Sequence, residues 1–127
     1  MQVGETLVVE TAAAWRAWLE AHHAARAEIW LVSFRRSSGK HSLAHAAARD
    51  EARCFGWADG PSAPIDADSF ATRWAPRSPN QAWSSLDQAR ARRLVESGRL
   101  MSPGIAAMPP RLRAELGLRG RPGKRSL

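Results

Sequence analysis

Residues 28–36, EIWLVSFRR, are rich in Ile, Val, Trp and Phe and alternate loosely between apolar and polar side chains. β-branched and aromatic residues in such a run are typical of a strand, so we expect the central strand of a sheet here. Two other segments have a similar character, ETLVVE at 5–10 and SFATRWAP at 69–76. The sequence therefore predicts a small sheet of about three or more strands.

Helical segments lie between these strands. Thr11 is placed to cap a helix over 11–26, whose large apolar residues recur at helical spacing. Ser42 is placed to cap a second helix over 42–55, which Gly56 would stop. Strands interleaved with helices through irregular connections are typical of an α+β domain, with the sheet packed against helices. The direction of the strands stays open.

The remaining segments are predicted from turn and cap residues. Segments 37–40, 58–66 and 77–83 are rich in residues that favour turns and loops. Ser84 and Asp87 have the spacing of a capping box, which predicts the start of a third helix. That helix would end at the following glycine, and two Pro-containing pairs further along suggest short helical starts.

The net charge of +7 is unevenly distributed. Residues 1–110 carry 13 Lys and Arg against 11 Asp and Glu, a net of +2, whereas residues 111–127 carry six against one, a net of +5. We therefore expect one domain over 1–117 and a basic, disordered tail over 118–127. A basic tail attracts nucleic acid or acidic partners without specificity. No nucleic-acid-binding motif accompanies it, so that role rests on charge alone.

A single cysteine and the absence of a long apolar run limit the function classes. One cysteine excludes an internal disulfide, and no cluster has the spacing of a zinc site. No signal peptide or membrane-spanning segment is recognisable. We therefore expect a cytoplasmic protein with a reduced thiol, without a metal or cofactor.

Cys54, the single cysteine, is a candidate nucleophile. It lies near the end of its predicted helix, which is the wrong pole for stabilising a thiolate. His45 lies about 180° around that helix at roughly 100° per residue, out of reach of the sulfur, and the nearby Glu51 would raise the pKa of the thiol. Cys54 is accordingly expected to be a small buried residue.

Two acidic residues are better candidates for a site. Glu51 lies near the inner face of the second helix, where a carboxylate needs a partner such as Arg73 or Arg77. Two interpretations stay open. The acids and arginines either form an internal ion pair between helix and strand, or they converge, with Asp59, in a polar pocket under aromatic side chains. Trp57 and Trp83 are the candidate walls.

Five blocks of sequence, occurring in this order, resemble the YdeI/OmpD-associated family, whose members are often labelled bacteriocin-protection proteins. The blocks are WRAWLEAHH (15–23), EIWLVSFRRSSGKHSL (28–43), DEARCFGWADG (50–60), FATRWAPRSPNQAWS (70–84) and ARRLVESGRL (91–100). Arg53 stands where the family pattern has Leu, and Ala58 where it has Ile. Many members also continue into a basic helical region that is cut short here.

The resemblance implies a small cytosolic bacterial α+β domain with a recurrent polar and aromatic cluster. It also implies a link to envelope stress or bacteriocin protection, with an envelope-related protein as a potential partner. Carried over to this sequence, the cluster consists of Glu51, Cys54, Gly56, Trp57, Asp59, Arg73, Pro76, Arg77, Trp83 and Ser84.

Three functions are compatible with these features. The first is a non-enzymatic module for a small or peptide-like anionic ligand, held by Arg73 and Arg77 between the two tryptophans, with the acids orienting the arginines. The second is a hydrolase or transferase that uses Glu51 or Asp59 as base, with Cys54 or Ser84 near the chemistry. The third is interaction with nucleic acid or protein through the basic tail.

Overall fold

The computed structural model describes residues 2–118. It confirms an α+β fold, with a four-stranded mixed sheet of order β1-β2-β4-β3. The strands are β1 (Thr6–Leu7), β2 (Ile29–Phe34), β3 (Trp57–Pro64) and β4 (Ser69–Pro76). β1 pairs parallel with β2, and the other neighbouring strands pair antiparallel. Apart from its first residue, the tail predicted over 118–127 lies outside the described residues.

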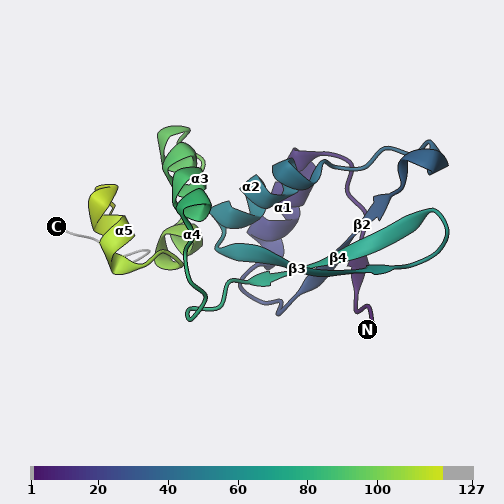
Figure 1. Cartoon of the computed structure of the whole chain (residues 1–127), viewed down its shortest axis with the longest axis horizontal. Helices are drawn as coiled ribbons and strands as arrows, with labels where there is room; N and C mark the ends of the chain where they lie inside the picture. The colour runs from purple at the N-terminus through teal and green to yellow at the C-terminus, as the bar shows by residue number, and fades with distance from the viewer. Residues whose placement is uncertain (1, 119–127) are drawn as a thin grey trace.

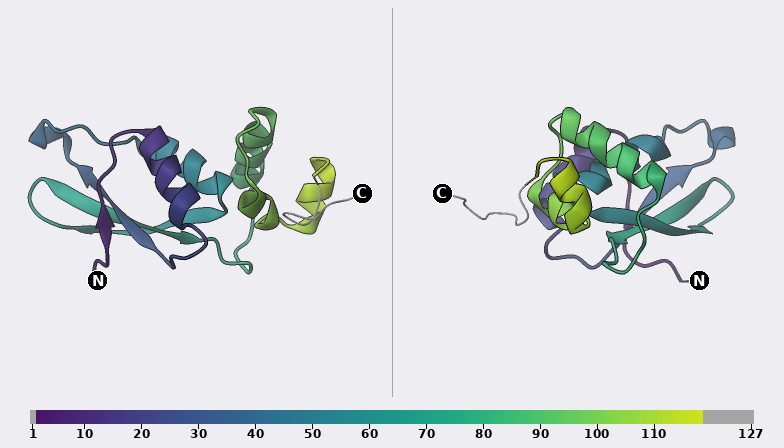
Figure 2. Two further views of the ribbon diagram at one scale, coloured as in Figure 1. Left: turned by 180° about the vertical axis from the view of Figure 1, so that it is seen from behind. Right: turned by 60° about the vertical axis from the view of Figure 1, so that its left-hand side comes forward.

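Helices cover one face of this sheet. α1 (Ala12–His22) and α2 (His45–Cys54) lie side by side on that face (Figure 1). Among the described residues no helix covers the opposite face (Figure 2). A short 3-10 helix, η1 (Arg36–Ser38), follows β2.

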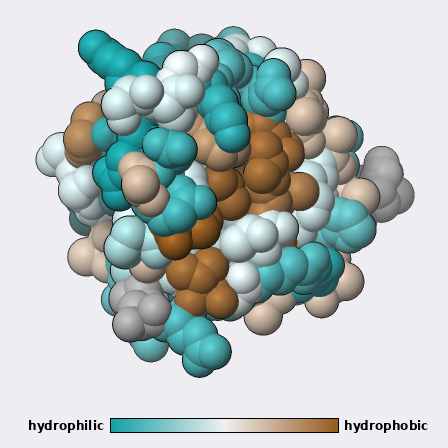
Figure 3. Space-filling view, turned by 90° about the vertical axis from the view of Figure 1, so that its right-hand side faces the viewer, coloured by the Kyte–Doolittle hydropathy of each residue, from teal (hydrophilic) through white to brown (hydrophobic). Residues whose placement is uncertain are grey.

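Three further helices gather at the end of the sheet where β3 begins and β4 ends (Figure 1). They are α3 (Ser85–Glu96), α4 (Ser102–Ala106) and α5 (Pro110–Glu115). The other end of the molecule carries the β3–β4 turn, and there apolar side chains gather in the middle of a more hydrophilic surface (Figure 3). None of the helices described here is long and apolar enough to cross a membrane.

Tryptophans join the two helices to the sheet. The indole Nε1 of Trp15 donates a hydrogen bond to the carbonyl oxygen of Ala48 at 2.9 Å, which links α1 to α2. The Trp15 ring meets the Trp74 ring edge-on, and Trp18 meets Trp57 in the same way, with centroids 6.0 and 5.8 Å apart. Large aromatic side chains thus fill the space that the many alanines of these helices leave open.

The two predicted helix caps have different outcomes. Thr11 is the N-cap of α1, and its hydroxyl accepts a hydrogen bond from the backbone N–H of residue 14 at 3.0 Å, as predicted. The prediction for Ser42 is wrong, because α2 begins at His45 and its N-cap is Ala44. The Ser42 hydroxyl instead accepts the backbone N–H of Phe34 at 2.6 Å and so fixes the end of β2.

The segment predicted as a loop over 58–66 is mostly strand β3, so that prediction is wrong. β3 lies at the edge of the sheet, where only one side of the strand needs hydrogen-bond donors. Pro61 and Pro64 are therefore tolerated, and the register shift between Asp59 and Ser62 accommodates the Gly60–Pro61 pair.

Most other predicted elements are present. The strands predicted at 28–36 and 69–76 correspond to β2 and β4, the capping box opens α3, and both Pro-containing segments begin short helices. The strand predicted over 5–10 is only two residues long, and the helix predicted over 11–26 ends at His22.

A close backbone contact fixes α4 to the joint between α2 and β3. The chain turns at Gly56, whose φ of 75° is in the left-handed region that favours glycine. Gly104 in α4 lies directly against this joint, and the backbone N–H of Met101 donates to the carbonyl oxygen of Cys54 at 3.0 Å. This joint therefore sets the position of α4 relative to the sheet.

Substitution of Gly104 tests this contact. A Cβ atom at Gly104 would lie 2.6 Å from the carbonyl oxygen of Cys54 and 2.7 Å from that of Arg53. We expect Gly104→Ala to lower the free energy of unfolding by about 1–3 kcal/mol, because backbone atoms cannot move aside cheaply. Gly60→Ala is the matched control, since its nearest neighbour would be at an ordinary 3.6 Å. Equal unfolding midpoints of the two variants in urea would contradict the expectation.

Candidate binding site

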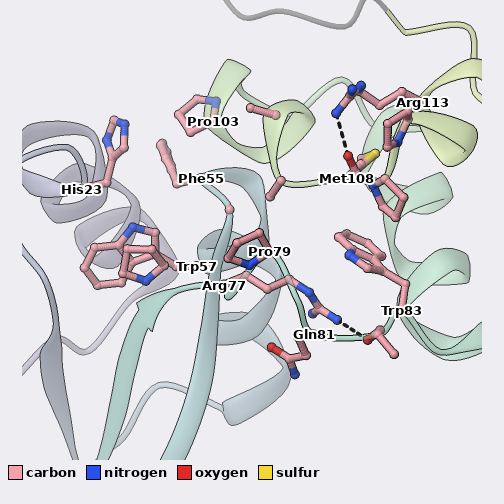
Figure 4. A pocket seen from close by; sticks show the side chains of 17 residues that line it. His23, Phe55, Trp57, Arg77, Pro79, Gln81, Trp83, Pro103, Met108 and Arg113 are labelled. Atoms are coloured by element: carbon pink, nitrogen blue, oxygen red, sulfur yellow. Dashed lines mark hydrogen bonds between the residues drawn. The ribbon is translucent and has the colours of Figure 1, made fainter.

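A cavity of about 750 Å³ lies between the α2–β3 joint, the end of β4 and helices α4 and α5. We call it the α4–α5 cavity. Phe55 and Trp57 line it from the joint, and Trp83 lines it from the loop before α3 (Figure 4). Five prolines complete much of its wall, namely Pro76, Pro79, Pro103, Pro109 and Pro110. Indole and proline rings make this wall both apolar and stiff.

The charged side chains that line the cavity are basic. Arg77 and Arg113 line it together with the imidazole of His23 (Figure 4), whereas none of its lining residues is Asp or Glu. A cavity with apolar walls, two guanidinium groups and no carboxylate is complementary to a ligand that joins an anionic group to an apolar body.

The Arg77 side chain, 3% exposed, is held by several contacts. Its Nη2 donates to the carbonyl oxygen of Ala82 at 2.8 Å and to Oδ2 of Asp87 at 3.1 Å. Its guanidinium lies 4.4 Å from the centroid of the Trp83 ring. Nε of Arg77 is buried and makes no hydrogen bond with the described residues. Arg77 is thus held in one orientation, with its charge paired to Asp87.

Asp87 ties this arginine to the start of α3. Its carboxylate accepts the backbone N–H of Ser84, and the Ser84 hydroxyl accepts the backbone N–H of Asp87. Burial raises the pKa of the Asp87 carboxyl, but hydrogen bonds from Ser84 and the charge of Arg77 outweigh burial and lower that pKa below its ordinary value. The carboxylate therefore stays ionised and orients Arg77.

Arg113 is the second cationic group, and the sequence analysis missed it. Its Nη1 donates to the carbonyl oxygen of Met108 at 2.6 Å (Figure 4), and it makes no ion pair with the described residues. Pro110 is the first residue of the short helix α5, which brings Arg113 to the cavity. The pair of prolines was the available signal for this turn, although it does not indicate what the helix faces.

The predicted functions rely on eight residues of the ten-residue cluster, and of these eight, three line the cavity and one supports it. Trp57, Arg77 and Trp83 line it, and Ser84 is the N-cap of α3 beside it. The other four, Glu51, Cys54, Asp59 and Arg73, are not among its lining residues. Gly56 and Pro76, the other two cluster residues, also line it.

Glu51 belongs to a separate buried ion-pair network. Its carboxylate accepts a hydrogen bond from Nη1 of Arg16 in α1 at 3.0 Å and another from Arg99. The prediction that Arg73 or Arg77 would pair with it is therefore wrong, because α1 and the segment after α3 supply nearer guanidinium groups. Glu51 holds three segments of the chain together.

Asp59 and Arg73 bind different partners on opposite faces of the sheet. The Asp59 carboxylate contacts Nε2 of His45 at 3.0 Å and Arg53 at 3.4 Å. Burial raises its pKa, but hydrogen bonds and the charges of Arg53 and His45 reverse the effect, and the pKa is lowered. Arg73 donates to Glu28 on the face that the helices leave open. The predicted convergence of these acids and arginines is not present.

Cys54 is fully buried at the end of α2. Its Sγ donates to the carbonyl oxygen of Asp50 at 3.2 Å. Burial raises the pKa of the thiol above its ordinary value, although the neighbouring Arg16 opposes this. A buried, protonated thiol is unsuited to nucleophilic attack.

Thiol labelling tests this description of Cys54. We expect the native protein to react with a thiol reagent at pH 7 at least about 100-fold more slowly than the urea-unfolded chain, since reaction requires local opening. The rates are measured by absorbance of the released chromophore. Comparable rates in the two states would contradict the description and restore Cys54 as a candidate nucleophile.

Replacement of Glu51 tests the ion-pair network. Glu51→Gln leaves Arg16 and Arg99 without their shared carboxylate, so we expect the free energy of unfolding to fall by about 2–3 kcal/mol. Glu5→Gln removes a more exposed carboxylate that pairs with Arg26, and we expect a loss of at most about 1 kcal/mol. Thermal and urea unfolding measure both. A Glu51→Gln variant as stable as Glu5→Gln would contradict a structural role.

Comparison with known proteins corrects the resemblance inferred from the sequence. The family model that matches is that of another family, so the assignment to the YdeI/OmpD-associated family is wrong. The expected links to bacteriocin protection, envelope stress and an envelope-related partner lose their basis with it. No curated protein and no solved structure matches the chain. A match over residues 7–107, which extends from β1 to the end of α4, shows that the chain belongs to the family described as "Domain of unknown function (DUF8412)".

Proposed function

We propose that this domain is a non-enzymatic module that binds an anionic ligand with an apolar body in the α4–α5 cavity. The observation that carries the proposal is the composition of the cavity wall, which combines Arg77 and Arg113 with the half-buried Trp83 and five prolines and contains no acidic residue. A volume of about 750 Å³ lies in the range of about 300–1,000 Å³ that ligand sites occupy. We also propose that the protein is located in the cytoplasm.

The two arginines have different tasks in this proposal. Arg77 is buried, paired with Asp87 and stacked on Trp83, so it supplies a fixed guanidinium at the side of the cavity near the start of α3. Arg113 lines the same cavity from α5 and supplies a second positive charge. A carboxylate or phosphate group between them would gain charge-assisted hydrogen bonds, while the ligand's body contacts the indole and proline rings.

The geometry gives less support to the enzymatic alternative. A general base must reach a reacting group through a hydrogen bond or one water molecule. Glu51 is instead enclosed by two arginines, and Asp59 contacts a histidine and an arginine outside the cavity. Cys54 and Ser84 are occupied by packing and by helix capping.

Binding of small anions tests the proposal. The probes are a panel of aromatic and aliphatic carboxylates and phosphate esters, each with its neutral amide or alcohol counterpart. We expect anions such as phenylacetate to shift the indole N–H resonance of Trp83 in NMR titrations, and phenylacetamide to do so far more weakly. Added salt should weaken the binding, because the attraction is partly electrostatic.

Two arginine variants, one inside the cavity and one outside it, test whether Arg113 binds the anion. We expect Arg113→Gln to weaken binding of the best anion about tenfold, which corresponds to about 1.4 kcal/mol. Arg93→Gln changes the charge by the same amount, but this side chain lies on α3, is 58% exposed and does not line the cavity. It should bind as wild type. Equal affinities of both variants, or equal binding of anions and neutral counterparts, would overturn the proposal.

A further inference from the structure

A second hollow adjoins the α4–α5 cavity and extends the surface that a ligand would contact. We call it the α5 hollow. It has a volume of about 460 Å³ and is lined by Trp83, Gln88, Pro109, Arg111, Leu112 and Glu115. Trp83 and Pro109 line both hollows, so the two meet at these side chains. Together they exceed the upper end of about 1,000 Å³ that is usual for a small-molecule site.

The chemistry of the α5 hollow differs from that of the cavity. Glu115 offers a carboxylate that is shared between Arg92 at 3.4 Å and Arg111 at 3.7 Å. The side-chain amide of Gln88 provides both donors and an acceptor at the same wall. The cavity thus attracts an anionic group, whereas the α5 hollow offers partners for N–H donors and for carbonyl oxygens. A compact anion would contact only the residues of the α4–α5 cavity.

The residues between the two hollows suit an extended chain. Trp83 is half-buried, and together with Pro109 it lines both hollows. Flat aromatic and proline surfaces of this kind accommodate extended and polyproline-type peptides, because such chains lose little conformational entropy on binding.

From these observations we infer that the ligand of this site is an extended peptide segment with an acidic residue. Its acidic side chain enters the α4–α5 cavity between Arg77 and Arg113, its apolar or proline residues cross Trp83 and Pro109, and its backbone groups face Gln88 and Glu115. The inference rests on the proposed function and adds the chemical class of the ligand.

A randomised peptide library displayed on phage and selected on the immobilised 127-residue chain tests the inference. We expect the enriched sequences to share an acidic residue next to proline or large apolar residues. The most enriched sequence is then synthesised, and its affinity is measured by fluorescence anisotropy for wild type and variants.

The affinities of three variants test where on the protein the peptide binds. We expect Arg113→Gln to weaken binding about tenfold and Glu115→Gln about threefold, each through lost hydrogen bonds. Glu96→Gln, an exposed α3 residue that lines neither hollow, should bind as wild type. Glu115→Gln should leave phenylacetate binding unchanged, since that anion occupies only the cavity.

The outcomes separate the inference from the proposed function. If no peptide is enriched while small carboxylates still shift Trp83, the ligand is a small molecule and only the inference fails. Enriched peptides that bind wild type, Arg113→Gln and Glu115→Gln equally would also overturn it, because they would bind elsewhere. If neither peptides nor small anions bind, both the inference and the proposed function fail.

Discussion

The contact between Gly104 and the carbonyl groups of the α2–β3 joint is the constraint on which the rest of the site depends. It brings the backbone of α4 closer to the end of α2 than a Cβ atom at position 104 would allow. It therefore places α4 directly beside the start of β3. Main-chain packing therefore fixes the position of α4, whose residues line one side of the cavity. Phe55 and Trp57, which lie at the same joint, also line the cavity. Side-chain ion pairs add to this main-chain contact, since Arg99 binds Glu51 of α2 and Asp87 of α3 binds Arg77 after β4.

Much of the fold was predictable because local signals and tertiary packing agree. β2 and β4 are the inner strands, so their apolar patterns are strong, and the capping box of Ser84 and Asp87 is a purely local motif. β3 was missed because an edge strand does not need every donor and so contains prolines. Ser42 was misassigned because a hydroxyl that resembles a helix cap can equally well bond to a distant strand.

The site was predicted only in part, for a related reason. Trp57, Arg77 and Trp83 lie close to glycine, proline and cap residues, which mark where the chain turns, and turns bring such side chains together. The partners of Glu51 lie 35 and 48 residues away in the chain, and no local pattern selects Arg16 or Arg99 among the many arginines. Arg113 lies in a basic segment whose prolines predict a short helix but not the surface that the helix faces, so only the fold reveals its position.

The irregular edge strand has a consequence for how this domain meets other chains. A regular outer strand is a template on which foreign backbone can add as a further strand, and such addition underlies both aggregation and one mode of peptide capture. β3 offers a poor template, because prolines remove donors and a register shift breaks its spacing. β1, at the opposite edge, pairs through only two residues. Neither edge strand is therefore a long, regular template for added backbone, which favours recognition of partners through side chains.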